Sequence, residues 1–145
     1  DAGSHKVDAL FYVTGLDIAE VFARSDKCGS RVEIVTSISA VSTDGVPVTL
    51  DFVGHANHLA EDLHIHCAEA DLLIRDMRPW IARNNVVEPI SPLEPESHPV
   101  ETFLNLLDGT SPNVAPIECA WPVYAFTQAA LASAATGQSV NVPPR

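Results

Sequence analysis

Three side chains at the start of the sequence, Asp1, His5 and Asp8, have spacings at which an α-helix presents them on one face. If the helix already runs at Asp1, a rotation of about 100° per residue places the three within roughly 60° of one another around the axis. The apolar residues of the same segment would lie on the opposite side and dock the helix. An imidazole beside a carboxylate can accept a proton from a reacting hydroxyl group. The spacing therefore predicts a candidate general base on a docked helix.

Three alternatives stay open for this segment. Gly3, Ser4 and His5 together also occur as a remnant of tag removal. Asp and His residues are common on the solvated faces of surface helices. Ser4 could instead be the N-cap, which would leave Asp1 outside the helix and away from His5. Spacing alone does not decide among them.

The composition predicts one folded domain. The chain has 145 residues, and 46% of them are hydrophobic, which suffices for a core of ordinary size. Eight Lys and Arg residues against nineteen Asp and Glu residues give a net charge of -11, which repels nucleic-acid phosphates and anionic lipid. No stretch reaches the roughly 20 apolar residues of a membrane-spanning helix. We expect a single α+β domain over residues 1–145, with neither nucleic acid nor a membrane as partner.

The cysteines, Cys28, Cys67 and Cys119, are odd in number, widely spaced and free of any C-x-x-C pair. This pattern fits buried thiols in a reducing compartment better than a disulfide framework, so it predicts a cytoplasmic protein. The sequence starts without an initiator Met and without a basic segment followed by an apolar run. This abrupt start indicates a fragment of a longer protein.

Short β-rich runs follow the first helix, which Gly15 is expected to end, and each run is bounded by turn residues. They cover residues 17–26, 31–42, 46–55, 61–69, 71–77 and 79–83. Asp44 and Gly45, between the second and third runs, are typical of a hairpin turn. We expect a mostly antiparallel sheet of five to six or more strands with helices packed on one face. The other face, with Val35 and Ile38, would be covered by a partner.

The segment 84–99 contains four prolines and three glutamates, which predicts an extended loop and neither a strand nor a helix. The next segment, 98–109, has apolar residues at i, i+3, i+4 and i+7. Pro99 falls in its first turn and Gly109 follows its end, so this segment predicts a short helix.

The Ala-rich run 116–138 predicts a largely buried helix that ends at Gly137. Pro122 would kink this helix or delay its start. Glu118 and Trp121, near its start, are expected to serve only in capping and core packing.

Four histidines and a cysteine crowd a short span, namely His55, His58, His64, His66 and Cys67. On a strand, His64 and His66 share a face about 7 Å apart at Cα, so a third ligand from elsewhere would complete a zinc site. However, the spacing matches no zinc motif. The alternation predicts an apolar inward face that includes Cys67 and an outward face that carries the two histidines. We therefore expect no metal site.

Two segments carry a resemblance to a known family. DAGSHKVDALFYVTG, residues 1–15, resembles the second-domain helix motif D-x-G-x-H-x-x-D of the Gfo/Idh/MocA family of glucose-fructose oxidoreductases and inositol dehydrogenases. Residues 103–142 are similar to the C-terminal pattern of that family, in which a short helix ending in Gly is followed by a loop and a long Ala-rich helix closing on S-A-A-x-G-x-x-V-x-V. The resemblance covers nearly the whole chain.

The resemblance implies the dihydrodipicolinate-reductase-like C-terminal domain of a two-domain NAD(P)-dependent dehydrogenase. The substrate would be a sugar, polyol or inositol-like molecule, and NAD or NADP would bind mainly to an N-terminal Rossmann domain absent from this chain. His5 would be the proton acceptor, Asp1 would assist it, and Asp8 would support the substrate or the structure. A homodimer or tetramer would form through the sheet face. The family's glycine-rich fingerprint and its Lys-Pro segment do not occur here, so the chain would hold half of an active site.

Two hypotheses follow from these patterns. One is a catalytic and substrate-binding domain, and the other is a non-catalytic binding or oligomerisation module of the same fold. An upstream strand, Gly-rich turn and Lys-Pro segment would favour the enzyme. A metal-dependent hydrolase is a third reading, which metal analysis would distinguish.

The isolated chain should fold and self-associate, yet bind no dinucleotide and oxidise no substrate. Its apolar-faced helices and sheet supply a core, whereas no phosphate-binding turn is present. Sedimentation should show a dimer or larger species, and Val35→Glu should shift it toward monomer, because the charge would disrupt an apolar contact. A monodisperse monomer at tens of micromolar, or measurable NAD binding, would contradict this prediction.

Overall fold

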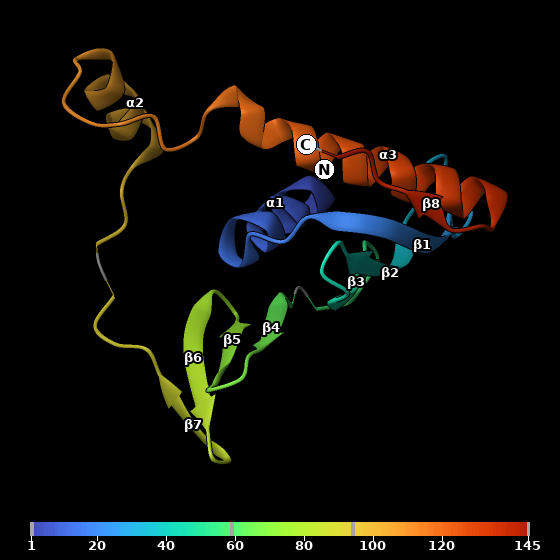
Figure 1. Ribbon diagram of the computed structural model, residues 1–145, viewed down its shortest axis with the longest axis horizontal. Coiled ribbons are helices and arrows are strands. Elements are labelled where there is room, and N and C mark those ends of the chain that lie inside the picture. The colour runs from blue at the N-terminus through green and yellow to red at the C-terminus, as the bar shows by residue number, and fades with distance from the viewer. Residues whose placement is uncertain (1, 59, 94, 145) are drawn as a thin grey trace. The chain divides into compact units, whose positions relative to one another are not determined.

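The computed structural model describes residues 2–58, 60–93 and 95–144, and the chain forms two compact units. The first unit comprises the residues up to 55 together with those from 113 onward, and the second comprises Ala56–Pro112. Each unit contains a four-stranded antiparallel sheet, which confirms the α+β class (Figure 1). The strands of the described residues thus form two sheets of four, whereas the sequence predicts one sheet of five to six or more. The single domain stays a prediction. Within the described residues, no helix is long and apolar enough to cross a membrane.

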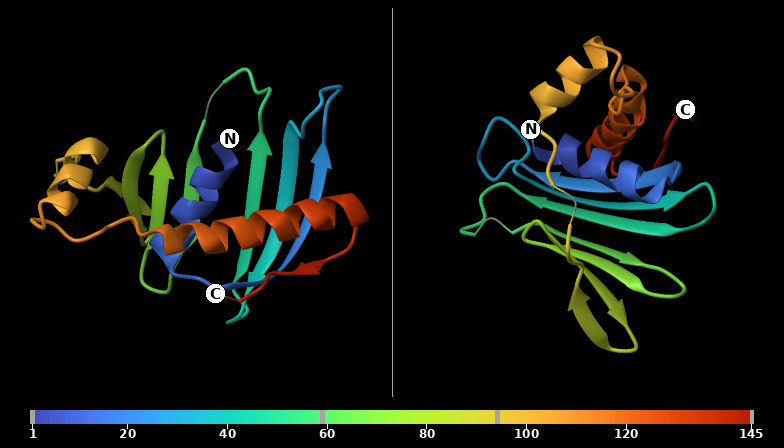
Figure 2. Two further views of the ribbon diagram at one scale, coloured as in Figure 1. Left: turned by 90° about the horizontal axis from the view of Figure 1, so that it is seen from above. Right: turned by 90° about the vertical axis from the view of Figure 1, so that its left-hand side faces the viewer.

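The first unit combines four strands with two long helices. Its elements are α1 (Ala2–Thr14), β1 (Ile18–Asp26), β2 (Val35–Ser42), β3 (Pro47–Val53), η1 (Ile117–Cys119), α3 (Ala120–Thr136) and β8 (Val140–Asn141). The strand order is β3-β2-β1-β8, and all neighbours are antiparallel. Helices α1 and α3 lie on the same face of this sheet, as the sequence predicts (Figure 2).

The core of the first unit lies between these helices and strands β1 and β2. Its buried members are Val7, Phe11, Ile18, Val21, Ala23, Ile38, Ala40, Phe126, Ala129 and Ala130. The rings of Phe11 and Phe126 meet edge to face with centroids 6.0 Å apart. The small side chains of Ala129 and Ala130 let α3 approach β1 closely, because they add little bulk at the contact.

Both helices of this unit end where the sequence predicts. Gly15 follows α1 and Gly137 follows α3, each with a φ of about 70° that a residue with a Cβ adopts only at a cost. Pro122 lies in the first turn of α3, where a missing N–H removes no helical hydrogen bond, so the helix begins ahead of it. Ser4 lies inside α1, so it is not the N-cap.

The second unit is a meander of four strands followed by one helix. Its elements are β4 (Asp62–His66), β5 (Asp71–Arg75), β6 (Arg78–Arg83), β7 (Val86–Pro89) and α2 (Pro99–Leu107), and the strand order is β4-β5-β6-β7. The predicted short helix is confirmed by α2. The Nδ1 of His98 accepts a hydrogen bond from the amide of Val100 at 3.3 Å, which caps the helix.

Strand β7 corrects the prediction that residues 84–99 form only a loop. Asn84 and Asn85 adopt positive φ angles of 51° and 64°, which make a two-residue turn that leads from Arg83 directly to Val86. Asn tolerates this left-handed conformation better than most residues, so it supports a tight hairpin. The proline and glutamate content of the segment hid this turn, because the prolines begin only at the last residue of β7.

Strand β2 corrects the expected position of Ile38. Ile38 is buried in the helix-covered core, whereas Val35 is only partly buried. Successive side chains of a strand point to opposite faces, so positions 35 and 38 cannot share one. Only Val35 belongs to the face expected to meet a partner.

The thiols correct the expectation of buried cysteines. Cys28, Cys67 and Cys119 are all exposed. Cys28 sits in the β1–β2 turn with a positive φ of 48°, Cys67 follows the end of β4, and Cys119 lies in η1. The pKa of the Cys28 thiol is raised, chiefly by partial desolvation. The negative charge of Asp26 and its hydrogen bond to Cys28 raise this pKa further.

Ser133 joins α3 to the sheet and to its own C-cap. Its hydroxyl has no exposed surface, accepts a hydrogen bond from the amide of Ala23 at 2.9 Å and donates one to the carbonyl of Gln138 at 2.6 Å. Ser133→Ala should lower the free energy of unfolding by about 1–3 kcal/mol, because a buried amide loses its acceptor. Urea unfolding measures this, with the exposed Ser139→Ala as control. Equal stability of the Ser133→Ala variant and the parent would contradict the assigned role.

Candidate functional site

His5 and Asp8 lie on the exposed side of α1, opposite the residues that this helix buries. Both side chains line one open groove of about 600 Å³ in the first unit. The predicted pairing of these two residues on one helix face is therefore confirmed. Asp1 lies outside the described residues, so its place beside His5 stays a prediction.

The groove is formed by α1, by the segment that leads into α3, and by the first half of α3. Its lining residues are Ser4, His5, Asp8, Ala115, Pro116, Ile117, Cys119, Ala120, Val123, Tyr124, Thr127 and Gln128. The α1 wall carries a hydroxyl, an imidazole and a carboxylate. The rest of the lining is mainly apolar, apart from the thiol of Cys119 and the polar ends of Tyr124, Thr127 and Gln128. Apolar walls with a few polar groups are a lining that small-molecule sites also have.

Tyr124, Thr127 and Gln128 line the groove, and the sequence patterns do not single them out. The Tyr124 side chain is 57% exposed, although aromatic side chains in helices usually pack inward. The hydroxyl of Thr127 donates to the carbonyl of Val123 at 2.7 Å and keeps its lone pairs for a ligand. The sequence does contain one indication of this wall. Tyr124 and Gln128 have i, i+4 spacing, which puts two large side chains on one face of an Ala-rich helix.

The groove offers a proton acceptor within reach of a bound molecule. An imidazole accepts a proton near neutral pH, and a carboxylate one helical turn away can stabilise the resulting charge or accept a hydroxyl hydrogen bond. The exposure of His5 and Asp8 leaves both open to a ligand that enters from solvent.

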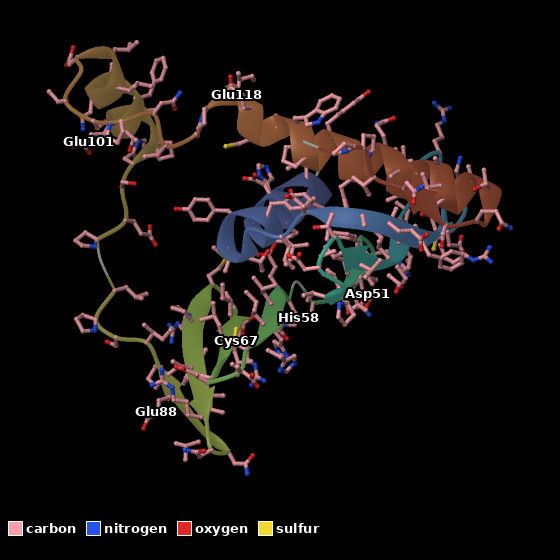
Figure 3. The ribbon with its side chains drawn as sticks, in the orientation of Figure 1. Asp51, His58, Cys67, Glu88, Glu101 and Glu118 are labelled. Carbon is pink, nitrogen blue, oxygen red and sulfur yellow. The ribbon has the colours of Figure 1, made fainter. Side chains whose placement is uncertain are left out.

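Trp121, in the first turn of α3, has a different place from the one expected. Trp121 is 48% exposed and does not pack in the core. Its ring lies 5.9 Å from that of Tyr124, and its indole N–H donates to the carbonyl of Pro144 at 3.5 Å. Glu118 lies in η1 and so precedes α3 (Figure 3). An apolar periodicity does not reveal which side of a helix remains uncovered, so the sequence made Trp121 a core residue.

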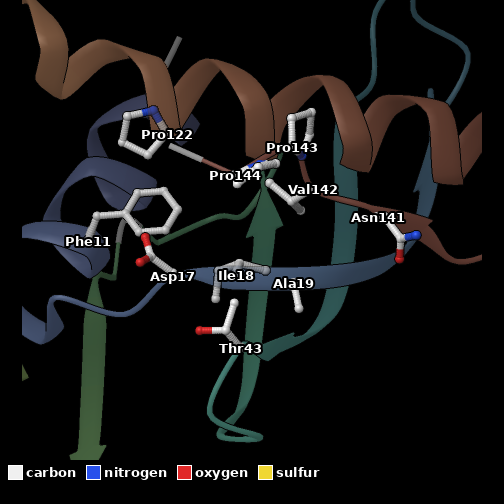
Figure 4. Close-up of a pocket in the computed structure, with 10 residues that line it drawn as sticks. All are labelled: Phe11, Asp17, Ile18, Ala19, Thr43, Pro122, Asn141, Val142, Pro143 and Pro144. Carbon is white, nitrogen blue, oxygen red and sulfur yellow. The ribbon is translucent and has the colours of Figure 1, made fainter.

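A second cavity of about 400 Å³ lies elsewhere in the first unit (Figure 4). Phe11 and Ile18 line it together with Pro122 of α3 and the C-terminal residues 141–144. Asp17 is the one titratable side chain among its lining residues. The lining residues of this cavity include no imidazole, whereas those of the groove include His5.

The histidine strand forms an exposed hairpin in the second unit. His64 and His66 are exposed on β4, while Leu63 and Ile65 are partly buried, so the predicted alternation is confirmed within the strand. Cys67, predicted to face inward with them, is exposed because it lies beyond the end of β4. The Nδ1 of His66 lies 3.1 Å from the Asp71 carboxylate on β5. Across the part of the chain that the structure describes, no group of three or more His, Cys, Asp or Glu side chains could hold a metal ion.

No protein-family model matches the sequence, and no curated protein matches it. Solved structures do match its fold. A UDP-N-acetylglucosamine 3-dehydrogenase from Acidithiobacillus ferrooxidans is 15% identical with a TM-score of 0.83, and the match covers 95% of this chain and 47% of that one. The WlbA dehydrogenase from Bordetella pertussis, in complex with NADH and UDP-GlcNAcA, is 18% identical with a TM-score of 0.77, over 99% and 44%.

An aldose-aldose oxidoreductase from Caulobacter crescentus is 15% identical with a TM-score of 0.78, over 96% of this chain and 45% of that one. These structures are oxidoreductases of the Gfo/Idh/MocA type, so the comparison confirms the predicted fold. The chain spans less than half the length of each of these three structures.

The protein should carry no stoichiometric zinc. An exposed histidine pair without a third ligand holds transition metals only loosely, and one of the two imidazoles already lies against Asp71. Elemental analysis after purification without chelators measures the metal content. One tightly held metal ion per chain, lost in a His64→Ala, His66→Ala double variant, would refute this prediction.

Proposed function

We propose that this chain, which has the fold found in dehydrogenases of the Gfo/Idh/MocA type, is the C-terminal, substrate-binding domain of an NAD(P)-dependent oxidoreductase. The substrate is a sugar, polyol or inositol-like molecule, and one of its hydroxyl groups is oxidised. His5 accepts the hydroxyl proton, Asp1 assists His5, and Asp8 supports the substrate or the helix.

One observation carries this proposal. His5 and Asp8 are exposed on α1 and line the same groove, in a fold shared with sugar-nucleotide and aldose oxidoreductases. The motif at residues 1–15 supports it independently, because the same two positions are those of the family's histidine and second acidic residue. A solvated helix face would not require a groove beside these two residues.

The role proposed for His5 follows from the proton that alcohol oxidation releases. Converting a C–H and an O–H bond into a carbonyl group releases one hydride and one proton. A base within hydrogen-bond reach of the hydroxyl takes the proton, so charge does not build up on the oxygen. The carboxylate of Asp8 on the same helix would then stabilise the imidazolium that forms.

The residues of this chain do not fit a dinucleotide. A pyrophosphate binds where a glycine-rich turn leads from a strand to a helix N-terminus with free amide groups. In the described residues, α2 follows a proline-containing segment and is capped by His98, and α3 follows η1, whose N-cap is Pro116. We therefore expect another domain to bind NAD or NADP, and this chain to supply the proton acceptor and contacts to the substrate.

A non-catalytic interaction module is the second candidate, because α2 presents an uncovered apolar face. This helix has no buried residue, and four apolar side chains are each more than half exposed: Val100, Phe103, Leu104 and Leu107. A module of this kind would retain the groove but would not depend on His5.

In the full-length protein to which the chain belongs, His5→Ala should lower turnover by about 10² to 10⁴, the range of a general-base contribution. Folding should be unaffected, because the side chain is exposed. Asp1→Asn should lower turnover less. Steady-state oxidation of a sugar substrate at saturating NAD(P) measures the effect.

The matched control is His58→Ala, which removes another exposed imidazole that lies in the second unit and does not line the groove. Turnover that stays unchanged in His5→Ala would remove the catalytic proposal and favour the interaction module.

A further inference from the structure

The α3 wall of the groove holds an exposed aromatic ring. Tyr124 is 57% exposed, and Trp121 braces it from one side with ring centroids 5.9 Å apart and planes inclined by 35°. One helical turn further along, Gln128 adds an exposed amide to the same wall. An apolar ring surface and a bifunctional hydrogen-bonding group therefore stand side by side.

The opposite wall is polar. Ser4, His5 and Asp8 line it from α1, so a molecule in the groove meets an aromatic face on one side and hydrogen-bonding groups on the other. The volume of about 600 Å³ is within the usual range for small-molecule sites.

This asymmetry matches a molecule with one flat C–H surface and a hydroxylated edge. A six-membered ring with equatorial hydroxyls presents its axial C–H bonds as such a surface, which can bury apolar area against an aromatic ring. An open-chain polyol of similar size presents no preformed apolar face, and it would lose rotational freedom about several bonds on binding. Hydroxyls on the ring's edge would pair with the Gln128 amide and with Asp8.

We infer that Tyr124 is a specificity-determining residue that stacks on the substrate ring and selects cyclic over open-chain polyhydroxylated molecules, with Gln128 hydrogen-bonding to the ring hydroxyls. This inference rests on the proposed function, since it takes the groove with His5 as the substrate site. Trp121 is a positioning residue, which limits the orientations open to the Tyr124 ring.

Ligand binding to the chain itself tests the ring contact without any oxidation step. Saturation-transfer NMR with methyl β-D-glucopyranoside should show the strongest transfer to the C–H protons of one ring face, and D-glucitol should receive little. Tyr124→Ala should weaken glucopyranoside binding about tenfold, whereas Tyr124→Phe should retain it, because the ring and not the hydroxyl makes the contact. Equal transfer to both probes, or an unchanged signal in Tyr124→Ala, would overturn the inference.

Tyr12→Ala is the matched control, because Tyr12 lies on α1, is 85% exposed and does not line the groove. This variant should bind the glucopyranoside as the parent does. A loss in Tyr12→Ala equal to that in Tyr124→Ala would show that the probe binds exposed aromatic rings without selecting the groove, and would overturn the inference.

The cysteines locate the bound probe. Cys119 lines the groove, whereas Cys67 is exposed in the second unit. Saturating methyl β-D-glucopyranoside should slow the alkylation of Cys119 by iodoacetamide severalfold and leave the rate at Cys67 unchanged. Equal rates at Cys119 with and without the probe would place the ring outside the groove and would overturn the inference.

Kinetics of the full-length protein separate this inference from the proposed function. Tyr124→Ala should raise KM for a cyclic substrate about tenfold with little change in kcat, while His5→Ala should lower kcat. If His5→Ala leaves turnover unchanged but Tyr124→Ala still weakens glucopyranoside binding, the catalytic proposal fails and the proposed stacking of the substrate ring on Tyr124 is retained. If His5→Ala abolishes turnover and Tyr124→Ala changes neither KM nor probe binding, the inference on Tyr124 alone fails.

Discussion

The edge-to-face contact between Phe11 of α1 and Phe126 of α3 is the interaction on which the candidate site depends. Phe126 has no exposed surface, and both rings belong to the cluster that packs on β1 and β2. The contact holds two helices that are far apart in sequence at a fixed separation. His5 and Tyr124 line a groove on the solvent side of the same helix pair, so its width depends on that separation.

Regular elements on both sides give this groove a defined shape. Backbone hydrogen bonds and core packing limit the positions open to a helical side chain, so helices hold chemical groups more accurately than loops do. The Ser133 hydroxyl adds to this rigidity, because it ties α3 to β1 and to the helix end at once. The two walls therefore keep different chemistry, polar on α1 and largely apolar on α3.

The fold by itself does not set the function. At 15 to 18% identity, the matched dehydrogenases share an architecture with this chain, and the same architecture could support binding or assembly without catalysis. What points to proton transfer here is local, namely an imidazole and a carboxylate on one helix face beside a groove. The uncovered apolar face of α2 is an equally local feature that points to association.

Local patterns in the sequence were enough to predict the three α-helices of the described residues and where they end, because apolar periodicity and terminal glycines act over a few residues. They also determined that His5 and Asp8 share a helix face, which depends only on helical geometry. The same patterns did not predict β7, because the prolines of the segment suggested a loop although an Asn-Asn turn leads into the strand. They also predicted the wrong burial for Ile38 and the cysteines. Burial depends on what packs against an element, and the sequence of that element does not contain this information. For the same reason, only the tertiary structure decided that Tyr124 and Gln128 line one groove with His5: residues more than 110 positions apart come to one surface through the packing of α1 and α3 on one sheet.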